Sequence, residues 1–150
     1  MGIVAEIQTA VKALLPGITG HTQLTYEYDI TLNSDRGYEK RFGFIPAVGD
    51  FVDGRALGST TIDHTFQLIL TDDFSNRDCD DAQNIALMGL YTAAQEVLKE
   101  LQKSRLALPT PTNQVLLIRG LAFEDPEFSS DNSTVALRNN FNIQYRYRNN

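Results

Sequence analysis

The sequence predicts an α+β fold, with a mainly antiparallel β-sheet, a short N-terminal helix and one long helix packed on the sheet. The first observation is the alternation of apolar and polar side chains over residues 134–148, which is typical of a strand with one buried face. The second is an apolar stripe at helical spacing over residues 80–104. The third is the grouping of strands before and after that helix, which favours antiparallel pairing. A length of 150 residues fits one domain, residues 1–150.

The first predicted element is a helix, because apolar residues recur at helical spacing at Val4, Ile7, Val11 and Leu14. Pro16 and Gly17 predict its end. Residues 23–32 then alternate strictly between apolar and polar side chains, which predicts a half-buried strand. A turn at residues 33–37 predicts that residues 38–45 return as its hairpin partner.

Residues 46–59 are predicted to form a long loop, or a loop with one short strand, because they hold Pro46, Gly49, Gly54 and Gly58 around Phe51 and Val52. Loops of this length are uncommon in compact domains unless they bind something or pack against a partner. Residues 60–71 alternate again and predict a strand. Ile69 is an exception, an apolar residue on the polar side of that strand.

The long helix is expected over residues 80–104, with acidic residues at its start and basic residues at its end that complement the helix dipole. Its expected apolar stripe is Ile85, Leu87, Met88, Leu90, Ala93, Ala94, Val97, Leu98 and Leu101. Residues 114–123 predict a strand, residues 124–133 an acidic loop, and residues 134–148 the last strand. In that strand the apolar side chains take the odd positions, which are Val135, Leu137, Phe141, Ile143, Tyr145 and Tyr147.

The composition indicates a folded protein, with 42% hydrophobic and 21% charged residues. The net charge of −6 is unevenly distributed, since residues 134–150 carry three arginines and no acid while the rest holds ten basic and nineteen acidic side chains. Such asymmetry favours contacts with complementary protein surfaces over binding to nucleic acid. A solvated basic strand face explains it equally well. Without a basic leader or a long apolar run, the chain is expected to remain in the cytoplasm where it is made.

Metal binding is weakly indicated by the acidic cluster of Asp72, Asp73, Asp78, Asp80 and Asp81. Asn76, Asp78 and Asp80 have the first three spacings of a calcium loop, but its sixth position is Asp81 instead of glycine and its twelfth is Leu87 instead of glutamate. Helix capping is therefore the preferred interpretation, and no metal is expected.

Catalytic chemistry is not indicated either, and we expect no enzyme, no catalytic residue and no cofactor. His21, His64 and Cys79 allow a cysteine–histidine pair formally, but acidic neighbours would raise the pKa of the Cys79 thiol. His64 lies on the apolar side of its strand and is expected in the core with one hydrogen bond, whereas His21 is expected to be solvated. Tyr145 and Tyr147 point away from the arginines of the same strand, so they cannot form a nucleic-acid platform with them.

The order of elements resembles the tail terminator (tail-completion) proteins of long-tailed bacteriophages. The residues that carry the resemblance are the helix at residues 3–15, the alternating stretch at residues 24–30, the helix after Asp80 and the closing strand at residues 137–148. The resemblance implies a structural protein of the virion tail or neck, assembled in the host bacterial cytoplasm. It implies a homo-hexameric ring that caps the tail tube, ends its polymerisation and forms the junction to the neck and head.

The partners implied by this resemblance are further copies of the chain, the tail tube protein and a neck or head-completion protein, with DNA passing through the ring without specific binding. We expect five residues to contribute to interfaces: Phe51, Val52, Arg138, Arg146 and Arg148. Two alternatives stay open. One is another neck component, such as a head-closure or adaptor ring. The other is a small monomeric ligand-binding domain, with a pocket under residues 46–59 lined by His64 and tyrosines.

Overall fold

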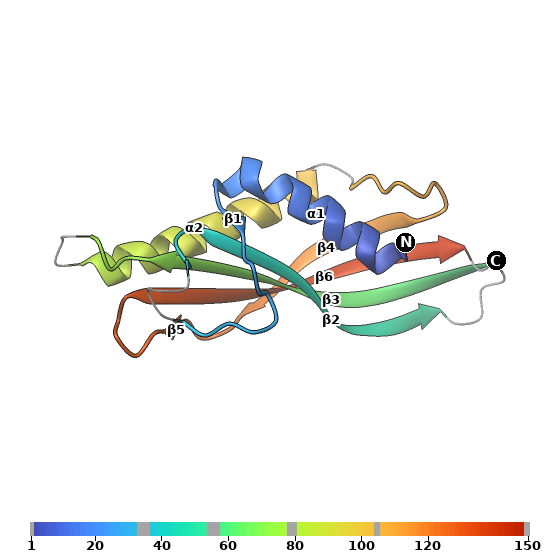
Figure 1. Ribbon diagram of the computed structural model, residues 1–150. Helices are drawn as coiled ribbons and strands as arrows, with labels where there is room; N and C mark the ends of the chain where they lie inside the picture. The colour runs from blue at the N-terminus through green and yellow to red at the C-terminus, as the bar shows by residue number, and fades with distance from the viewer. Residues whose placement is uncertain (1, 33–36, 54–57, 78–80, 104–105, 149–150) are drawn as a thin grey trace.

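The computed structural model describes residues 2–32, 37–53, 58–77, 81–103 and 106–148. Two helices cover one face of a six-stranded sheet, which confirms the predicted α+β fold (Figure 1). The strand order is β1-β2-β3-β6-β4, with β5 also paired to β6, and only the β1–β2 pair is parallel. The elements are α1 (Ile3–Thr19), β1 (Thr22–Gln23), β2 (Arg41–Asp53), β3 (Ser59–Asp73), α2 (Ala82–Lys103), β4 (Gln114–Phe123), β5 (Glu127–Phe128) and β6 (Thr134–Arg148).

The centre of the sheet is the antiparallel pair β3–β6, which runs without a register shift from Ser59 opposite Arg148 to Asp73 opposite Thr134. Because side chains alternate, the even positions of β3 and the odd positions of β6 face the helices. Phe66 and Phe141, which stand opposite each other, are both 0% exposed. The alternation predicted for both strands is confirmed. The assignment of residues 1–150 to one domain stays a prediction.

Helix α1 continues past the predicted stop at Pro16 and ends after Thr19, so that boundary was wrong. Gly20 closes the helix with φ 75°, and its N–H donates to the Pro16 carbonyl at 2.9 Å. The helix tolerates the proline because packing on the sheet continues beyond it, with Leu15 fully buried and Ile18 against the core. The prediction also placed Leu14 on the apolar face, but Leu14 is 43% exposed.

The strand predicted at residues 23–32 is wrong beyond Gln23. A further backbone bond joins Leu24 N–H to the Phe42 carbonyl, and the chain then leaves the edge of β2. The alternation arises partly because Leu24 packs with Tyr38 on Ile69, on the sheet face away from the helices. This second small core explains why Ile69 broke the pattern of its own strand. Alternation describes side chains, but a strand also requires backbone partners.

The long loop, or loop with one short strand, predicted at residues 46–59 is wrong for residues 46–53. Strand β2 continues through Pro46 to Asp53 and pairs with β3, so the antiparallel partner of β2 is β3 and not the segment before it. Residues 54–57 lie outside the described part of the chain. Proline is tolerated in β2 because its position lies at a bulge in an edge strand.

Helix α2 confirms the predicted long helix but buries a narrower stripe than expected. Ile85 and Met88 are 54% and 46% exposed, because the residues that face the sheet follow a different helical row. The buried row is Ala86, Leu90, Ala94, Val97 and Leu101. Neither helix in the described part of the chain is long and apolar enough to cross a membrane.

Two neighbouring leucines on α1 provide a matched test of this packing. Leu15→Ala should lower the free energy of unfolding by about 2–5 kcal/mol, because it removes a fully buried side chain. Leu14→Ala removes the same atoms from an exposed site and should change it by less than about 1 kcal/mol. Urea unfolding of both variants measures the difference, and equal losses would contradict the placement of α1.

Candidate functional site

The sheet face away from the helices carries a polar network across β3 and β6. The Arg138 Nη1 donates to Gln67 Oε1 at 3.0 Å, and its Nη2 lies 3.9 Å from a Glu127 carboxylate oxygen. Gln67 donates in turn to Asn140 at 3.2 Å and to Glu124. Arg138, one of the predicted interface residues, is therefore half-buried in contacts with its own chain.

The other predicted arginines lie at the far end of the same face and are exposed. Arg146 stands opposite Thr61, with its Nε 3.4 Å from the threonine hydroxyl, and Arg148 stands opposite Ser59. Arg119 of β4 joins them on this face, where its Nε donates to Asn142 at 3.2 Å. The structure thus places Arg146 and Arg148 at one end of this face, while Arg119 stands opposite Asn142, midway along β6 between Arg138 and Arg146. Sequence reasoning missed Arg119 because its strand was taken as uniformly apolar.

The outer edge of β2 is covered only at its beginning. The Phe44 carbonyl accepts from Gln8 Nε2 at 2.8 Å, and the Phe44 N–H donates to Glu27 Oε1 at 3.1 Å. Beyond this residue, no strand within the described residues pairs with that edge. Val48 and Val52 are 67% and 52% exposed there. The backbone of Phe51 pairs with Ile62, while its side chain lies outside the described residues.

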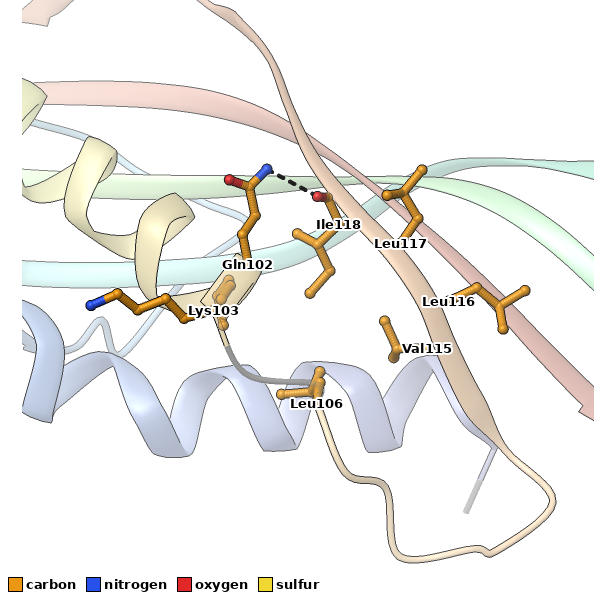
Figure 2. Close-up of a pocket in the computed structure, with 8 residues that line it drawn as sticks. Gln102, Lys103, Leu106, Val115, Leu116, Leu117 and Ile118 are labelled. Carbon is orange, nitrogen blue, oxygen red and sulfur yellow. Dashed lines mark hydrogen bonds between the residues drawn. The ribbon is translucent and has the colours of Figure 1, made fainter.

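The opposite edge of the sheet is β4, and it too has no strand partner on its outer side among the described residues. A groove of about 510 Å³ lies between β4 and the last turn of α2 (Figure 2). Gln102 reaches across it and donates to the Ile118 carbonyl at 3.1 Å. Leu117 and Leu121 of this strand are 47% and 46% exposed. The sheet therefore ends in two open edges, each bearing exposed aliphatic side chains.

His64 connects the β2 edge to the centre of the sheet. Its Nε2 lies 3.2 Å from the Ala47 carbonyl and its Nδ1 lies 2.8 Å from the Tyr145 hydroxyl. A carbonyl can only accept, so Nε2 carries the proton and Nδ1 accepts from the tyrosine. A Cβ added at Gly49 would lie 2.9 Å from Nδ1, so glycine is needed for this close approach. His64 faces the helices as predicted, but it is only half-buried and lies outside the hydrophobic core, and it makes two polar contacts instead of one.

Burial shifts the pKa of both partners in this pair. Desolvation lowers the pKa of His64 below its usual 6.5 and raises the pKa of Tyr145 to about 12. Both groups are therefore neutral at pH 7, which matches the assigned hydrogen bonds. The hydrogen bonds of His64 tie β2 to β3 and β6, so the geometry of the pair is that of a structural clamp.

His21 is buried, with 7% exposure, which overturns the expectation that it is solvated. Its Nδ1 lies 3.2 Å from the Thr19 carbonyl, and burial lowers its pKa. It lines a groove of about 480 Å³ beside α2, together with Asp72 and Arg77, which form an ion pair at 2.6 Å. Asp72, one member of the predicted acidic cluster, is therefore paired with Arg77.

The rest of the acidic cluster makes local contacts where it is described. Asp73 accepts from the Ser75 N–H and hydroxyl, and the Asp81 carbonyl accepts from the Ile85 N–H at the start of α2. Asp78, Cys79 and Asp80 lie outside the described residues. Within the described residues, no group of three His, Cys, Asp or Glu side chains is placed to hold a metal ion.

A third groove, of about 590 Å³, lies between the start of α1 and the ends of β3 and β6, and Tyr145, Tyr147 and Arg148 line it. It is the cavity nearest in kind to the expected tyrosine-lined pocket, although neither His64 nor residues 46–53 line it. Beside it, Glu6 is buried and accepts from Thr110 and Asn113, and these hydrogen bonds lower its pKa. This carboxylate fixes α1 to the segment before β4.

Buried His21 and half-buried His64 predict a loss of stability in mild acid. A histidine whose pKa is lowered by folding binds protons more readily when unfolded, so the free energy of unfolding should fall as pH drops below about 6.5. His64→Gln should reduce this slope between pH 7.5 and 5 by removing one of the two groups. Unfolding curves at several pH values measure it, with His21→Gln as the companion variant. An unchanged slope in both variants would contradict the assignment.

Comparison with known proteins supports the fold alone. No protein-family model matches the chain, and no curated protein matches it in sequence. A chain from the solved structure of the virion of a native gene transfer agent particle shares the fold, with a TM-score of 0.52 and 14% sequence identity. The match covers 99% of this chain and 98% of that chain. At this identity it establishes a common architecture over the whole length.

Proposed function

We propose that this protein is a structural subunit of a phage-like virion, of the tail terminator type, and that it has no enzymatic activity. The subunit forms a homo-hexameric ring on the last ring of the tail tube, which ends tube growth and presents a new surface to the neck. The partners are then other copies of the chain, the tail tube protein and a neck or head-completion protein. DNA passes through the ring without base-specific contacts.

The observation that carries the proposal is the likeness, from end to end, to a chain of a virion particle. A match confined to a common sheet motif would cover part of each chain, whereas this one covers 99% and 98%. The order of elements by which the sequence resembles tail terminators is consistent with that likeness. The virion context therefore comes from the neighbour, and the terminator role from the resemblance.

The shape of the sheet supports assembly as the function. Among the described residues, neither edge strand has a partner on its outer side, and both carry exposed valines or leucines. Unpaired edges are sites where another chain can add. A contact between the β2 edge of one copy and the β4 edge of the next is heterologous, and such contacts close into a ring when the rotation between copies is suitable. Ending tube growth in this way requires surfaces that bind other subunits and does not require a catalytic site.

Two alternatives differ in the partner. A head-closure or adaptor ring would use the same edges but bind the head side of the neck. A monomeric ligand-binding domain is favoured by one observation, the groove lined by Tyr145, Tyr147 and Arg148. Such a domain would use that groove and leave both sheet edges unpaired.

Mass measurement by light scattering, alone and with polymerised tail tubes from the same source, tests the proposal. A ring-sized mass or co-sedimentation with tube ends is the expected result. Binding to head or portal particles instead of tubes would favour the adaptor ring. A persistent monomer that ignores both would contradict assembly and favour a ligand in the tyrosine groove.

The exposed arginines give a mutational test of the same function. Arg146→Glu with Arg148→Glu should weaken assembly at physiological salt, because it reverses charge at the exposed end of the polar face. The free energy of unfolding should change by less than about 1 kcal/mol, since both side chains are exposed. Lys99→Glu, on the exposed side of α2, is the control and should assemble normally. Unchanged assembly of the double variant would remove these arginines from the interface.

A further inference from the structure

The two open edges carry matching side-chain patterns on the same face of the sheet. On β2, Val48 lies in a bulge opposite Thr65, and Asp50 stands opposite Asp63. Val52 lies in a second bulge, between Phe51 and the residue paired with Thr61, which is Asp53. These β3 residues take the odd positions, which face away from the helices. The edge of β2 therefore presents an aliphatic, an acidic and an aliphatic side chain in order, all of them exposed.

On β4 the corresponding pattern is aliphatic, basic, aliphatic. Leu117 stands opposite Gln144 and Arg119 opposite Asn142, while Leu121 lies in the bulge opposite Asn140. Those β6 residues take the even positions, which belong to the polar face. All three β4 side chains are exposed. The two edges are thus complementary in charge and similar in shape.

Asp50 has an unfavourable neighbour within its own subunit. It stands directly opposite Asp63, and like charges at opposite positions of a sheet are destabilising. Asp63 accepts from Gln144 at 3.2 Å, so it has a partner on its other side. A cation beyond the open edge of β2 would relieve the repulsion on Asp50. Arg119 of a neighbouring copy has the required charge.

We infer that β2 of one copy pairs antiparallel with β4 of the next, with Asp50 opposite Arg119, Val48 opposite Leu121 and Val52 opposite Leu117. This inference rests on the proposed self-assembly and specifies its contact. One register satisfies all three pairs, because the residues are spaced by two on each strand. The contact joins unlike edges, so each subunit uses both of its edges.

The strand directions permit this pairing. Strand β2 is antiparallel to β3, β3 to β6 and β6 to β4, so β2 and β4 run in opposite directions. A neighbour rotated about an axis along the strands keeps its β4 antiparallel to the first copy's β2 and keeps its polar face on the same side. The result is a sheet that continues from subunit to subunit.

The backbone positions agree with the same register. The Ile118 carbonyl accepts from the Gln102 side chain, which shows that it points off the outer edge of β4. Its second lone pair is available for a backbone N–H of a neighbouring copy. The register places Ile118 opposite Phe51, whose backbone alternates with Asp50 on β2. Asp50 and Arg119 then form a non-hydrogen-bonded pair, in which the Cα atoms approach to about 4.5 Å. Bulges on both strands confine the pairing to this short stretch.

Cysteine cross-linking tests the register, since Cα atoms at that separation can form a disulfide. The background is Cys79→Ser, because Cys79 is the only cysteine. Asp50→Cys and Arg119→Cys proteins are mixed under oxidising conditions, alone and with tail tubes, and should form a covalent dimer. Asp50→Cys with Arg119→Cys in one chain should form a ladder that ends at the ring. Asp50→Cys mixed with Lys99→Cys is the off-register control.

The result that would overturn the inference is assembly of the unmodified protein without a cross-link in the mixture. Cross-linking of Asp50→Cys protein to itself would also overturn it, because that requires a two-fold contact between like edges. Cross-linking in register with no binding to tubes would uphold the pairing and reject the terminator role. Tube binding and ring formation without the cross-link would uphold the terminator role and reject the pairing of β2 with β4. A protein that stays monomeric, with no cross-link and no tube binding, would reject both the pairing and the terminator role.

Charge reversal provides an independent measurement. Asp50→Arg alone, or Arg119→Asp alone, should reduce the fraction of ring-sized mass at least tenfold, because each places like charges opposite one another. Combining both substitutions should restore assembly, since the pair is reformed with its charges exchanged. If the combined variant assembles no better than either single variant, the two residues are not partners.

Discussion

The unbroken antiparallel pairing of β3 with β6 is the constraint on which the rest of the structure depends. Its 15 residue pairs, from Ser59–Arg148 to Asp73–Thr134, fix which side chains face the helices along the whole length of the sheet. A slip of one residue would exchange the two faces and bury the arginines of β6. Because the register holds, Phe66 and Phe141 meet in the core while Arg146 and Arg148 stay exposed. Strands β2 and β4 pair with β3 and β6, so their side chains also divide between the helix-covered face and the polar face.

Each outer strand is then satisfied by side chains over part of its length and left open over the remainder. Gln8 and Glu27 cover Phe44 of β2, and Gln102 covers Ile118 of β4. Beyond Phe44 on β2, and on both sides of Ile118 on β4, the edges carry exposed valines and leucines, together with Asp50 on one strand and Arg119 on the other. A stable monomer would normally protect such edges with charge or cover them. Partial protection with complementary patterns is what a subunit needs if it must remain folded alone and still join its neighbours.

The sequence predicted the elements whose burial follows a simple period, and failed where a partner decides the structure. The alternation of residues 134–148 and 60–71 and the periodicity of residues 80–104 gave β6, β3 and α2. The alternation of residues 24–32 misled, because Leu24 and Tyr38 cover Ile69 without forming a strand. The glycines and Pro46 suggested a loop, but edge strands with bulges accommodate both. For the candidate site, the sequence pointed to Val52, Arg146 and Arg148, which are exposed in the structure and whose interface role stays a prediction, whereas Arg119 was overlooked because residues 114–123 were taken as an apolar strand.

The central claim is that the two open edges of one sheet meet between copies of the chain. Hydrogen exchange of the backbone amides, compared between the free protein and the protein assembled on tail tubes, tests it most directly. The account predicts that the outward-pointing amides of Gly49, Phe51, Ile118 and Gly120 exchange slowly only in the assembled state, while the amides of β3 and β6 are protected in both states. Assembly with both edges still exchanging freely would contradict the claim and place the contacts elsewhere on the molecule.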